Sequence, residues 1–358
     1  MWSGGIGRTV AVVAAVGACA TACSSAGSSP AAGAPPAQAA SNATRPAAQA
    51  RQLHVDFTEQ PSRWRTVATF TYGKRADQLG PPGGSAGFSG PHGAAGGALA
   101  LPPAAIAYAS DSIWVLDQMK HRVAHFSLDG RYLGQVTGLS PTASDLAIAP
   151  ADEFVVIDDE PRAKVRTFAP TSGRASRAVG VTNAPGNLSR LVPTDTGFAA
   201  WFSPLEPSSP RDPADGLHPL RLDPPALKLT TPGAPEDDDL LSASISDDHV
   251  LHVQLAPEWE RTLTLTSRHK IGVGIQSMQI SGGYTYLWLY VAESRIHGTG
   301  GQFLLVLDGS GNVRSFEQIA TPPGGYDSEV TRPFAATSNG DVYQWFTTPT
   351  HAELRLRP

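Results

Sequence analysis

Residues 112–134 read SIWVLDQMKHRVAHFSLDGRYLG, and this stretch decides the fold class. Two runs rich in β-branched and aromatic residues are separated by the polar segment 118–121. A third run follows the Asp129-Gly130 pair, and an Asp-Gly pair between apolar runs is a strong hairpin signal. Together with the short apolar run 103–109, these runs predict four antiparallel strands, which is the size of one β-propeller blade.

The same stretch resembles the NHL repeat, whose pattern is an apolar run ending in Asp, a few polar residues, then His-Arg-Val and an aromatic residue before Asp-Gly. The matching residues, in order, are Asp117, His121-Arg122-Val123, Phe126 and Asp129-Gly130. The resemblance extends over about residues 102–170 and implies a rigid propeller that presents its loops to a protein, a peptide, a glycan or a small ligand. Because one fold serves many functions, the resemblance does not choose among them.

Related units begin near residues 102, 141, 187, 240, 277 and 332, which fits blades of about 40–50 residues. We therefore expect an all-β, six-bladed propeller of four-stranded antiparallel blades, with 270–275 as the fourth strand of the unit near 240. The last unit ends after three strands. The alternating run Trp64–Tyr72 can complete it, which closes the ring and removes exposed sheet edges. Seven blades, one of them built from residues 52–100, is the alternative.

The N-terminus has the pattern of a lipoprotein signal peptide. Arg8 precedes the uncharged run Thr9–Ala22, which is shorter than a membrane span of about 20 residues. Small residues precede both Cys19 and Cys23, and both runs resemble the bacterial lipobox. Cys23 is preferred because it leaves a more usual core length and no unpaired thiol, and Cys19 is the alternative. The lipid, with acyl chains such as palmitate, predicts anchoring to the outer face of the cell membrane.

The chain divides by composition after this signal. Residues 24–51 are small residues and proline, which predicts a disordered tether between the signal (1–23) and the propeller domain (52–358). The wealth of Ala, Gly, Pro and Arg suggests a GC-rich bacterium, such as an actinobacterium. The net charge of −5 offers no basic field for nucleic acid. We expect a monomer whose partners are the membrane, through the lipid, and an envelope protein, glycan or small ligand.

Residues 73–98 form a long glycine-rich loop without periodicity. A loop of this length is more often functional or mobile than structural. It lacks the GxxxxGK[ST] pattern, so it does not predict a phosphate-binding loop.

Propeller geometry places a ligand at the mouth of the central channel, where loops entering innermost strands meet loops that join second to third strands. The side chains predicted there are Lys120, His121, Asp145, Arg162, Arg190, Trp259, His297 and Arg332. Both signs of charge occur among them, and no catalytic residue, metal ligand set or cofactor is predicted.

Two other features have structural explanations. Asp117 and Arg122 flank a hairpin loop, which predicts a cross-strand ion pair, echoed by Asp158 with Lys164. The run Tyr284–Tyr290 alternates tyrosine and tryptophan, which favours blade core over a carbohydrate platform.

The enzyme alternative is a metal-dependent hydrolase, resembling the lactonases, or a lyase in the central channel. Calcium needs six to eight oxygen ligands, and the acids near predicted innermost strands are Asp145 and Asp237–Asp239. Asn312 and Asn339 are better explained by turns, and His249 and His252 point to opposite faces of a strand. The sequence therefore favours a non-enzymatic binding or scaffold lipoprotein.

Overall fold

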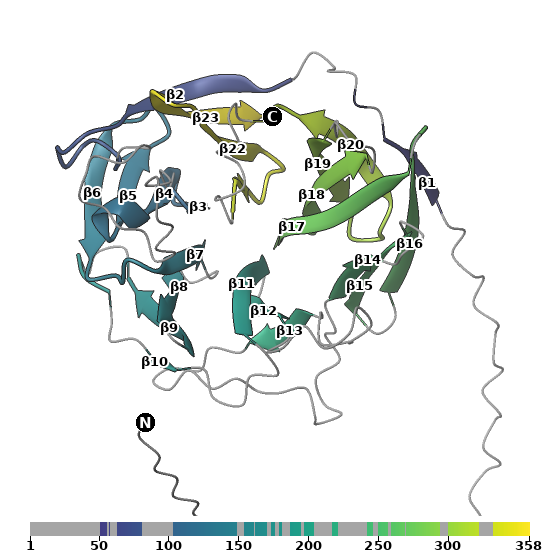
Figure 1. Ribbon diagram of the computed structural model, residues 1–358, viewed down its shortest axis with the longest axis horizontal. Coiled ribbons are helices and arrows are strands. Elements are labelled where there is room, and N and C mark those ends of the chain that lie inside the picture. Colours follow the sequence, from purple (N-terminus) through teal and green to yellow (C-terminus); the bar gives the residue numbers. More distant parts are fainter. Residues whose placement is uncertain are drawn as a thin grey trace, which may run out of the picture. The chain divides into compact units, whose positions relative to one another are not determined.

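The computed structural model describes residues 51–55, 57, 63–80, 103–148, 154–160, 162–169, 173–175, 179–180, 187–194, 197–203, 217–220, 242–245, 250–256, 259–268, 270–293, 300–321 and 332–358. They lie in one compact unit, Ala47–Pro358. Apart from the 3₁₀ turn η1 (Gln118–Lys120), the regular elements among these residues are β-strands (Figure 1). None of the described segments is an apolar helix long enough to cross a membrane.

Three sheets are four-stranded antiparallel meanders of consecutive strands. The first, which confirms the meander predicted from residues 103–136, contains β3 (Ala105–Ala109), β4 (Ser112–Asp117), β5 (Arg122–Ser127) and β6 (Tyr132–Thr137). The second contains β7 (Ala143–Ile148), β8 (Phe154–Glu160), β9 (Arg162–Phe168) and β10 (Val179–Gly180). The third contains β17 (Ile271–Ser281), β18 (Tyr284–Glu293), β19 (Gly300–Leu307) and β20 (Val313–Ile319).

Three further sheets are less regular. One has the described strands β11 (Asn187–Thr194), β12 (Gly197–Ser203) and β13 (Leu217–Leu220). Another has β14 (Ser242–Ile245), β15 (Val250–Ala256), β16 (Trp259–Thr266) and, at its edge, β1 (Arg51–His54). The last has β21 (Phe334–Ala336), β22 (Val342–Thr347), β23 (His351–Arg357) and β2 (Arg65–Thr71). The antiparallel pairing of β2 with β23 is the one predicted for the run Trp64–Tyr72.

The prediction for residues 270–275 is wrong. They are not the fourth strand of the sheet that contains β14, because they begin β17, the first strand of the next sheet. The edge position is held by β1, which pairs with β16 in parallel. Leu53 and Val55 explain this placement, since both are buried in the core shared with β15–β19. Parallel neighbours are distant in sequence, so local patterns do not reveal them.

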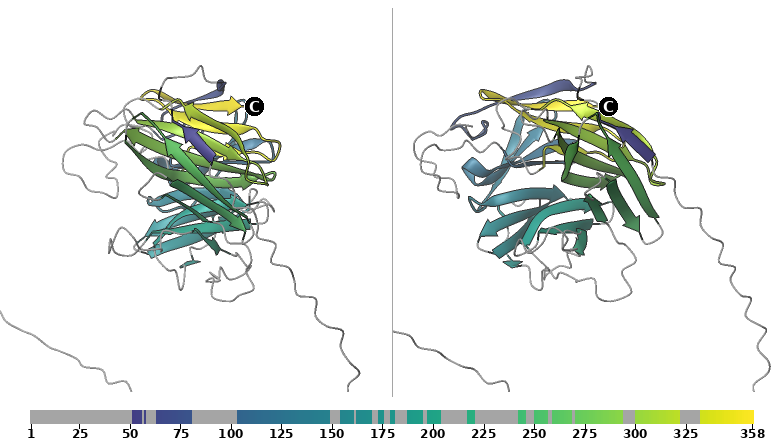
Figure 2. Two further views of the ribbon diagram at one scale, coloured as in Figure 1. Left: turned by 90° about the vertical axis from the view of Figure 1, so that its right-hand side faces the viewer. Right: turned by 45° about the vertical axis from the view of Figure 1, so that its right-hand side comes forward.

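The sheets lie around a common centre (Figures 1 and 2). The edge strands β3, β7, β11, β17 and β21 face that centre and are called the first strands below, whereas β1 and β2 join their sheets at the outer edge. The first strands contact one another from sheet to sheet: β3 contacts β7 and β21, β7 contacts β11, and β17 contacts β11 and β21. β17 contacts β11 directly, although the sheet that contains β14 comes between these two strands in the sequence. β14 itself packs against β17. The sheet that contains β14 therefore lies further out than its neighbours.

Aromatic side chains fill the space between sheets. Trp288 of β18 stacks on Phe334 of β21, with ring centroids 5.3 Å apart and an interplanar angle of 10°. Tyr286 and Trp288 are buried, which confirms the core role predicted for them, whereas Tyr290 at the end of the run is 40% exposed. Burying one large apolar side chain contributes about 1.5–3 kcal/mol, so these contacts stabilise the packing of sheet on sheet.

The β17–β18 hairpin yields a stability prediction. Its turn residues Gly282 and Gly283 both have positive φ, 60° and 74°, as a two-residue hairpin of this kind requires. A Cβ at Gly282 would overlap the backbone of Ser338 in the neighbouring sheet, whereas a Cβ at Gly283 would meet open space. Both alanine variants carry left-handed strain of about 1–2 kcal/mol. Gly282→Ala should cost about 1–3 kcal/mol more than Gly283→Ala in urea unfolding, and equal losses would contradict this packing.

A pH prediction concerns His125, which stacks on Trp114 at 3.8 Å with an interplanar angle of 8°. Burial lowers the pKa of His125 below its ordinary value of 6.5. As the pH falls below 6.5, the unfolded chain therefore takes up this proton before the folded chain, and stability is lost until the folded pKa is passed. His125→Phe should lose less stability than the wild type between pH 7.5 and pH 5 in urea unfolding. His54→Phe, at an exposed position on β1, should keep the wild-type pH dependence.

Candidate functional site

The predicted channel mouth lies where the first strands of the sheets begin. In an antiparallel meander the loop between the second and third strands lies at the same end as the start of the first strand. The structure joins these two places directly, because Gln118 in η1 donates a hydrogen bond from Nε2 to the backbone oxygen of Ala143, the first residue of β7. Two clusters of charged side chains lie at this end.

The first is the axial cluster, formed by Asp145, Arg190 and Arg332. Asp145 and Arg332 form an ion pair with side chains 0% and 2% exposed. The Asp145 carboxylate accepts from Arg332 at both oxygens, at 3.0 Å from Nε and 2.8 Å from Nη2. It also accepts from the backbone N–H groups of Leu146 at 2.8 Å and Leu191 at 2.7 Å. Four donors therefore saturate this carboxylate, and the bidentate fork fixes the direction of Arg332.

Arg332 connects four sheets. Its backbone N–H donates to Ala104 and its carbonyl accepts from Ile106 of β3, at 3.2 and 3.1 Å. Its guanidinium contacts Asp145 of β7 and donates to the carbonyl oxygens of Leu191 in β11 and Met278 in β17. The side chain of Arg332 thus stabilises the positions of three first strands relative to each other, and its backbone adds β3 as the fourth.

Irregular backbone accompanies this cluster on three strands. The register shifts between Ala143 and Asp145 in β7, between Leu188 and Arg190 in β11, and between Ile275 and Ser277 in β17. Each shift comes shortly before a residue that contacts Arg332 or lies beside one that does. β-Bulges redirect side chains and are common beside binding sites. The bulges explain why an even alternation along these strands does not predict which residues meet.

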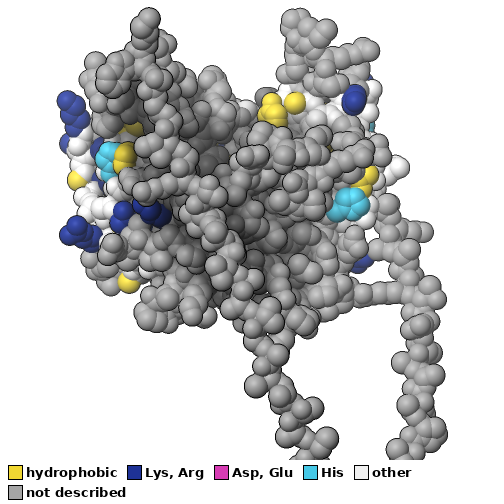
Figure 3. Space-filling model, turned by 60° about the horizontal axis from the view of Figure 1, so that its bottom comes forward, with side chains coloured by type: hydrophobic (Ala, Val, Ile, Leu, Met, Phe, Trp, Pro, Cys, Tyr) yellow, Lys and Arg dark blue, Asp and Glu magenta, His cyan; other side chains and the backbone are white. Residues whose placement is uncertain are grey.

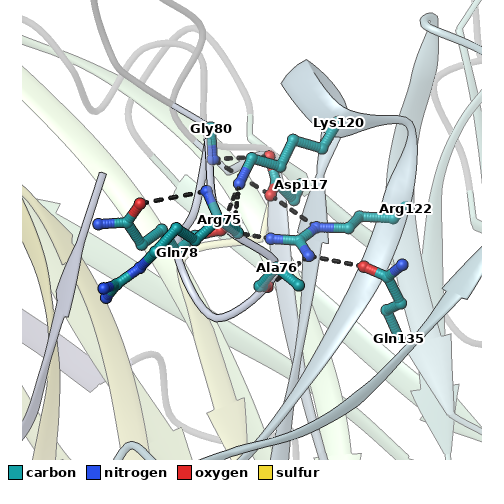
Figure 4. Close-up of polar contacts among 8 residues, drawn as sticks. All are labelled: Arg75, Ala76, Gln78, Gly80, Asp117, Lys120, Arg122 and Gln135. Atoms are coloured by element: carbon teal, nitrogen blue, oxygen red, sulfur yellow. Dashed lines mark hydrogen bonds and ion pairs between the residues drawn. The ribbon is translucent and has the colours of Figure 1, made fainter. Parts of the chain in front are cut away.

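The second cluster holds the strap, the segment Gly73–Gly80 that follows β2 (Figure 4). Leu79 of the strap is fully buried in the core between the β2 and β3 sheets. The Gly80 N–H donates to both carboxylate oxygens of Asp117, at 3.2 Å each. Asp117 in turn pairs with Arg122 at 3.0 Å, with side chains 1% and 3% exposed. The predicted Asp117–Arg122 ion pair is therefore present, and it also binds the strap.

Cations of the β4–β5 loop hold the rest of the strap. Arg122 Nη1 donates to the Ala76 carbonyl at 2.7 Å and to Oε1 of Gln135 at 2.7 Å, and Nη2 donates to the Gln78 carbonyl. Lys120 Nζ donates to the carbonyls of Arg75 at 2.7 Å and Gln78 at 2.6 Å. Burial lowers the pKa of Lys120, an effect that Arg122 reinforces and Asp117 opposes. Lys120, predicted as a ligand contact, directs two of its three donors to the strap.

The structure brings together three of the predicted mouth residues, Asp145, Arg190 and Arg332. His121 is exposed at the end of η1 with a left-handed φ of 52°. The side chains of Arg162, at the start of β9, and Trp259, at the start of β16, lie outside the described residues, as does all of His297.

Other sequence predictions have mixed outcomes. Asp158 and Lys164 are cross-strand neighbours in β8 and β9. Asn312 and Asn339 hydrogen bond within turns, to Asp308 and to Thr337 and Asp341, as predicted. Cys19, Cys23, His249 and Asp237–Asp239 lie outside the described residues. Within the described part of the chain, no three His, Cys, Asp or Glu side chains are grouped so that they could hold a metal ion.

Sequence reasoning misses the strap, because residues 73–98 show no periodicity that would separate 73–80 from the rest of the loop. One signal was present: Gly80 precedes Pro81, and a residue before proline is restricted to extended backbone. It also missed Gln118 and the carbonyl groups of Leu191 and Met278, since backbone acceptors leave no trace in side-chain patterns.

The surface can be judged from one side. In Figure 3 the charged side chains visible among the described residues are lysines and arginines (dark blue), accompanied by histidines (cyan). Among the described residues visible in this view, no Asp or Glu side chain is seen.

Comparisons with known proteins give no family. No protein-family model matches the sequence, and no curated protein is similar to it. Among solved structures, hydrazine synthase of Kuenenia stuttgartiensis is 11% identical, with 67% of this chain and 72% of that chain covered and a TM-score of 0.42. A streptogramin B lyase is 10% identical, with 71% and 93% covered and a TM-score of 0.37. A gluconolactonase of Xanthomonas campestris is 13% identical, with 71% and 86% covered and a TM-score of 0.33. Likenesses this weak support no conclusion about activity, so the β-propeller character of this chain rests on its sheets.

Proposed function

We propose that this chain is an exported lipoprotein, anchored through Cys23 to the outer face of the cell membrane, that binds a ligand or partner of the envelope without catalysing a reaction. Residues 1–23 are its signal peptide and 24–50 its tether, since Arg51, expected to end the tether, already belongs to β1. Its six sheets are the blades of one closed, NHL-like propeller. Support for closure comes from the pairing of β2 with β23 and from the contacts between first strands around the centre.

One observation carries the binding role over the hydrolase alternative. A metal-dependent site needs acidic or amide oxygens that are free to coordinate the ion. Of the acids that the sequence places near innermost strands, Asp145 is the one that the structure describes, and its two oxygens already accept four hydrogen bonds, two of them from Arg332. Coordination of a metal by Asp145 would break a buried ion pair, which costs about 3–5 kcal/mol. This acid supports the packing of the sheets instead.

Lipid attachment can be tested with the full chain in a bacterial host that processes lipoproteins. The wild type should fractionate with membranes and gain the mass of a lipidated N-terminal cysteine, because acyl chains hold it there. Cys23→Ser should lose both properties, and Cys19→Ser should keep them. A wild type without lipid would contradict the proposed membrane anchor. A Cys23→Ser variant that still carries lipid would show that Cys19 is the lipidated residue.

The non-catalytic role has its own test. The purified protein should show the same melting temperature in calcium, in zinc and in a chelator, because no metal contributes to its stability. Tightly bound stoichiometric calcium or zinc, removed by the chelator with a fall in melting temperature, would favour the hydrolase alternative.

A further inference from the structure

Arg190 lacks a neutralising partner among the described residues. Asp145 is the carboxylate beside it, and each of that group's hydrogen bonds goes to Arg332 or to the backbone of Leu146 and Leu191. The Nη1 atom of Arg190 is buried and has no hydrogen-bond partner. Burial lowers the pKa of Arg190; Asp145 opposes the shift and Arg332 adds to it.

The axial cluster is therefore positively charged. It holds two guanidinium groups, those of Arg190 and Arg332, against the one carboxylate of Asp145. A buried charge without a counter-charge is strongly unfavourable. Arg190 as a whole is of intermediate burial, so part of the residue faces solvent. An anion that binds there would supply the missing charge and the missing acceptor.

The backbone that carries Arg190 is held in place by hydrogen bonds of its neighbour. A register shift in β11 comes immediately before it. The backbone of the next residue, Leu191, is fixed by two hydrogen bonds: its N–H donates to Asp145 and its carbonyl accepts from Arg332. A residue on such a backbone has only its side chain left to order when a ligand arrives.

The neighbouring strand offers further unsatisfied polar atoms. β17 packs against β11, and the carbonyl of Met278 in β17 accepts from Arg332. At the bulge just before Met278, Gln276 Oε1 and Ser277 Oγ are buried without hydrogen-bond partners. Such atoms need a hydrogen-bond partner, which a bound water or a ligand can supply.

We propose that Arg190 is the anchor of a binding site for a small ligand that carries a carboxylate or phosphate group, with the Asp145–Arg332 pair as its rigid support. The planar fork of an arginine matches such oxyanions in a bidentate manner, which a lysine cannot do. This inference rests on the proposed binding function and names the class of its ligand.

The test uses the full chain in detergent at constant ionic strength. Inorganic phosphate and acetate are titrated separately, and binding is followed by calorimetry and by the melting temperature. At least one anion should bind saturably and raise the melting temperature. Arg190→Met should weaken that binding at least tenfold without lowering the melting temperature of the free protein, because it removes an uncompensated charge. Arg131→Met, at an exposed arginine in the β5–β6 turn, should bind like the wild type.

Each outcome has a consequence. Binding of phosphate alone or of acetate alone assigns the ligand group. Absence of binding by both anions, or equal binding by Arg190→Met, overturns the inference. If Arg190→Met does not fold, Arg190→Lys is the variant to test. It keeps the positive charge but lacks the planar guanidinium group, so it should bind the anion more weakly than the wild type. Lipidation of Cys23 is measured independently, so failure of the anchor and failure of the anion site are distinguishable.

Discussion

Asp145→Asn should lower the free energy of unfolding by about 3–5 kcal/mol, because it leaves the buried Arg332 without its counter-charge. The amide keeps the shape of the carboxylate, but it offers one acceptor oxygen where two oxygens now accept four hydrogen bonds. The loss is measured by urea unfolding followed through tryptophan fluorescence.

Two further variants separate charge pairing from packing. Asp77→Asn removes an exposed ion pair with Arg75, whose side chains are 49% and 71% exposed. It should cost less than about 1 kcal/mol. Replacing Asp145 and Arg332 together, by Leu and Met, should recover part of the stability that Asp145→Asn loses, because Arg332 is no longer left charged. The recovery stays partial, since the N–H groups of Leu146 and Leu191 lose their acceptor. A small loss in Asp145→Asn would contradict the supporting role of the pair.

Arg122→Met should both destabilise the fold and release the strap. It removes the buried partner of Asp117 and the hydrogen bonds to Ala76 and Gln78. Loss of one partner of a buried pair costs about 3–5 kcal/mol. Hydrogen exchange should accelerate in residues 73–80 before the strands of the β3 sheet are affected, because local opening needs less energy than global unfolding.

Gln135→Met is the matched control for the strap. Its exposed side chain gives up one hydrogen bond to Arg122, so the cost should be about 1 kcal/mol and the strap should stay protected. Equal exchange in residues 73–80 of Arg122→Met and of the wild type would show that Leu79 holds the strap without help from the cations.

The sheets built from neighbouring strands were predictable because their signals are local. The Asp129-Gly130 turn and the alternating runs beside it specify the meander β3–β6 without knowledge of the rest of the chain. The pairing of β1 with β16 was not predictable, since it joins Arg51 to Leu263 across most of the domain. The run 270–275 was assigned to the wrong sheet for the same reason. A strand pattern gives the faces of a strand but not its neighbours.

The location of the axial cluster was predictable, but its pairing was not. Asp145, Arg190 and Arg332 stand at equivalent places in three units, so topology alone brings them to one end of the fold. Which arginine pairs with Asp145 depends on bulges in β7 and β11 and on the carbonyl of Leu191. No side-chain pattern encodes these backbone details.

The placement of β1 has a mechanical consequence. The chain enters the folded unit at Arg51, and the four residues of β1 join it to β16. β2, which completes the last sheet, comes only later in the chain. Tension applied ahead of Arg51 therefore loads the short β1 first and reaches β2 only after β1 has detached. A moderate force on the N-terminal side should therefore detach β1 from β16 first. The pairing of β2 with β23, which completes the last sheet, should stay intact until then.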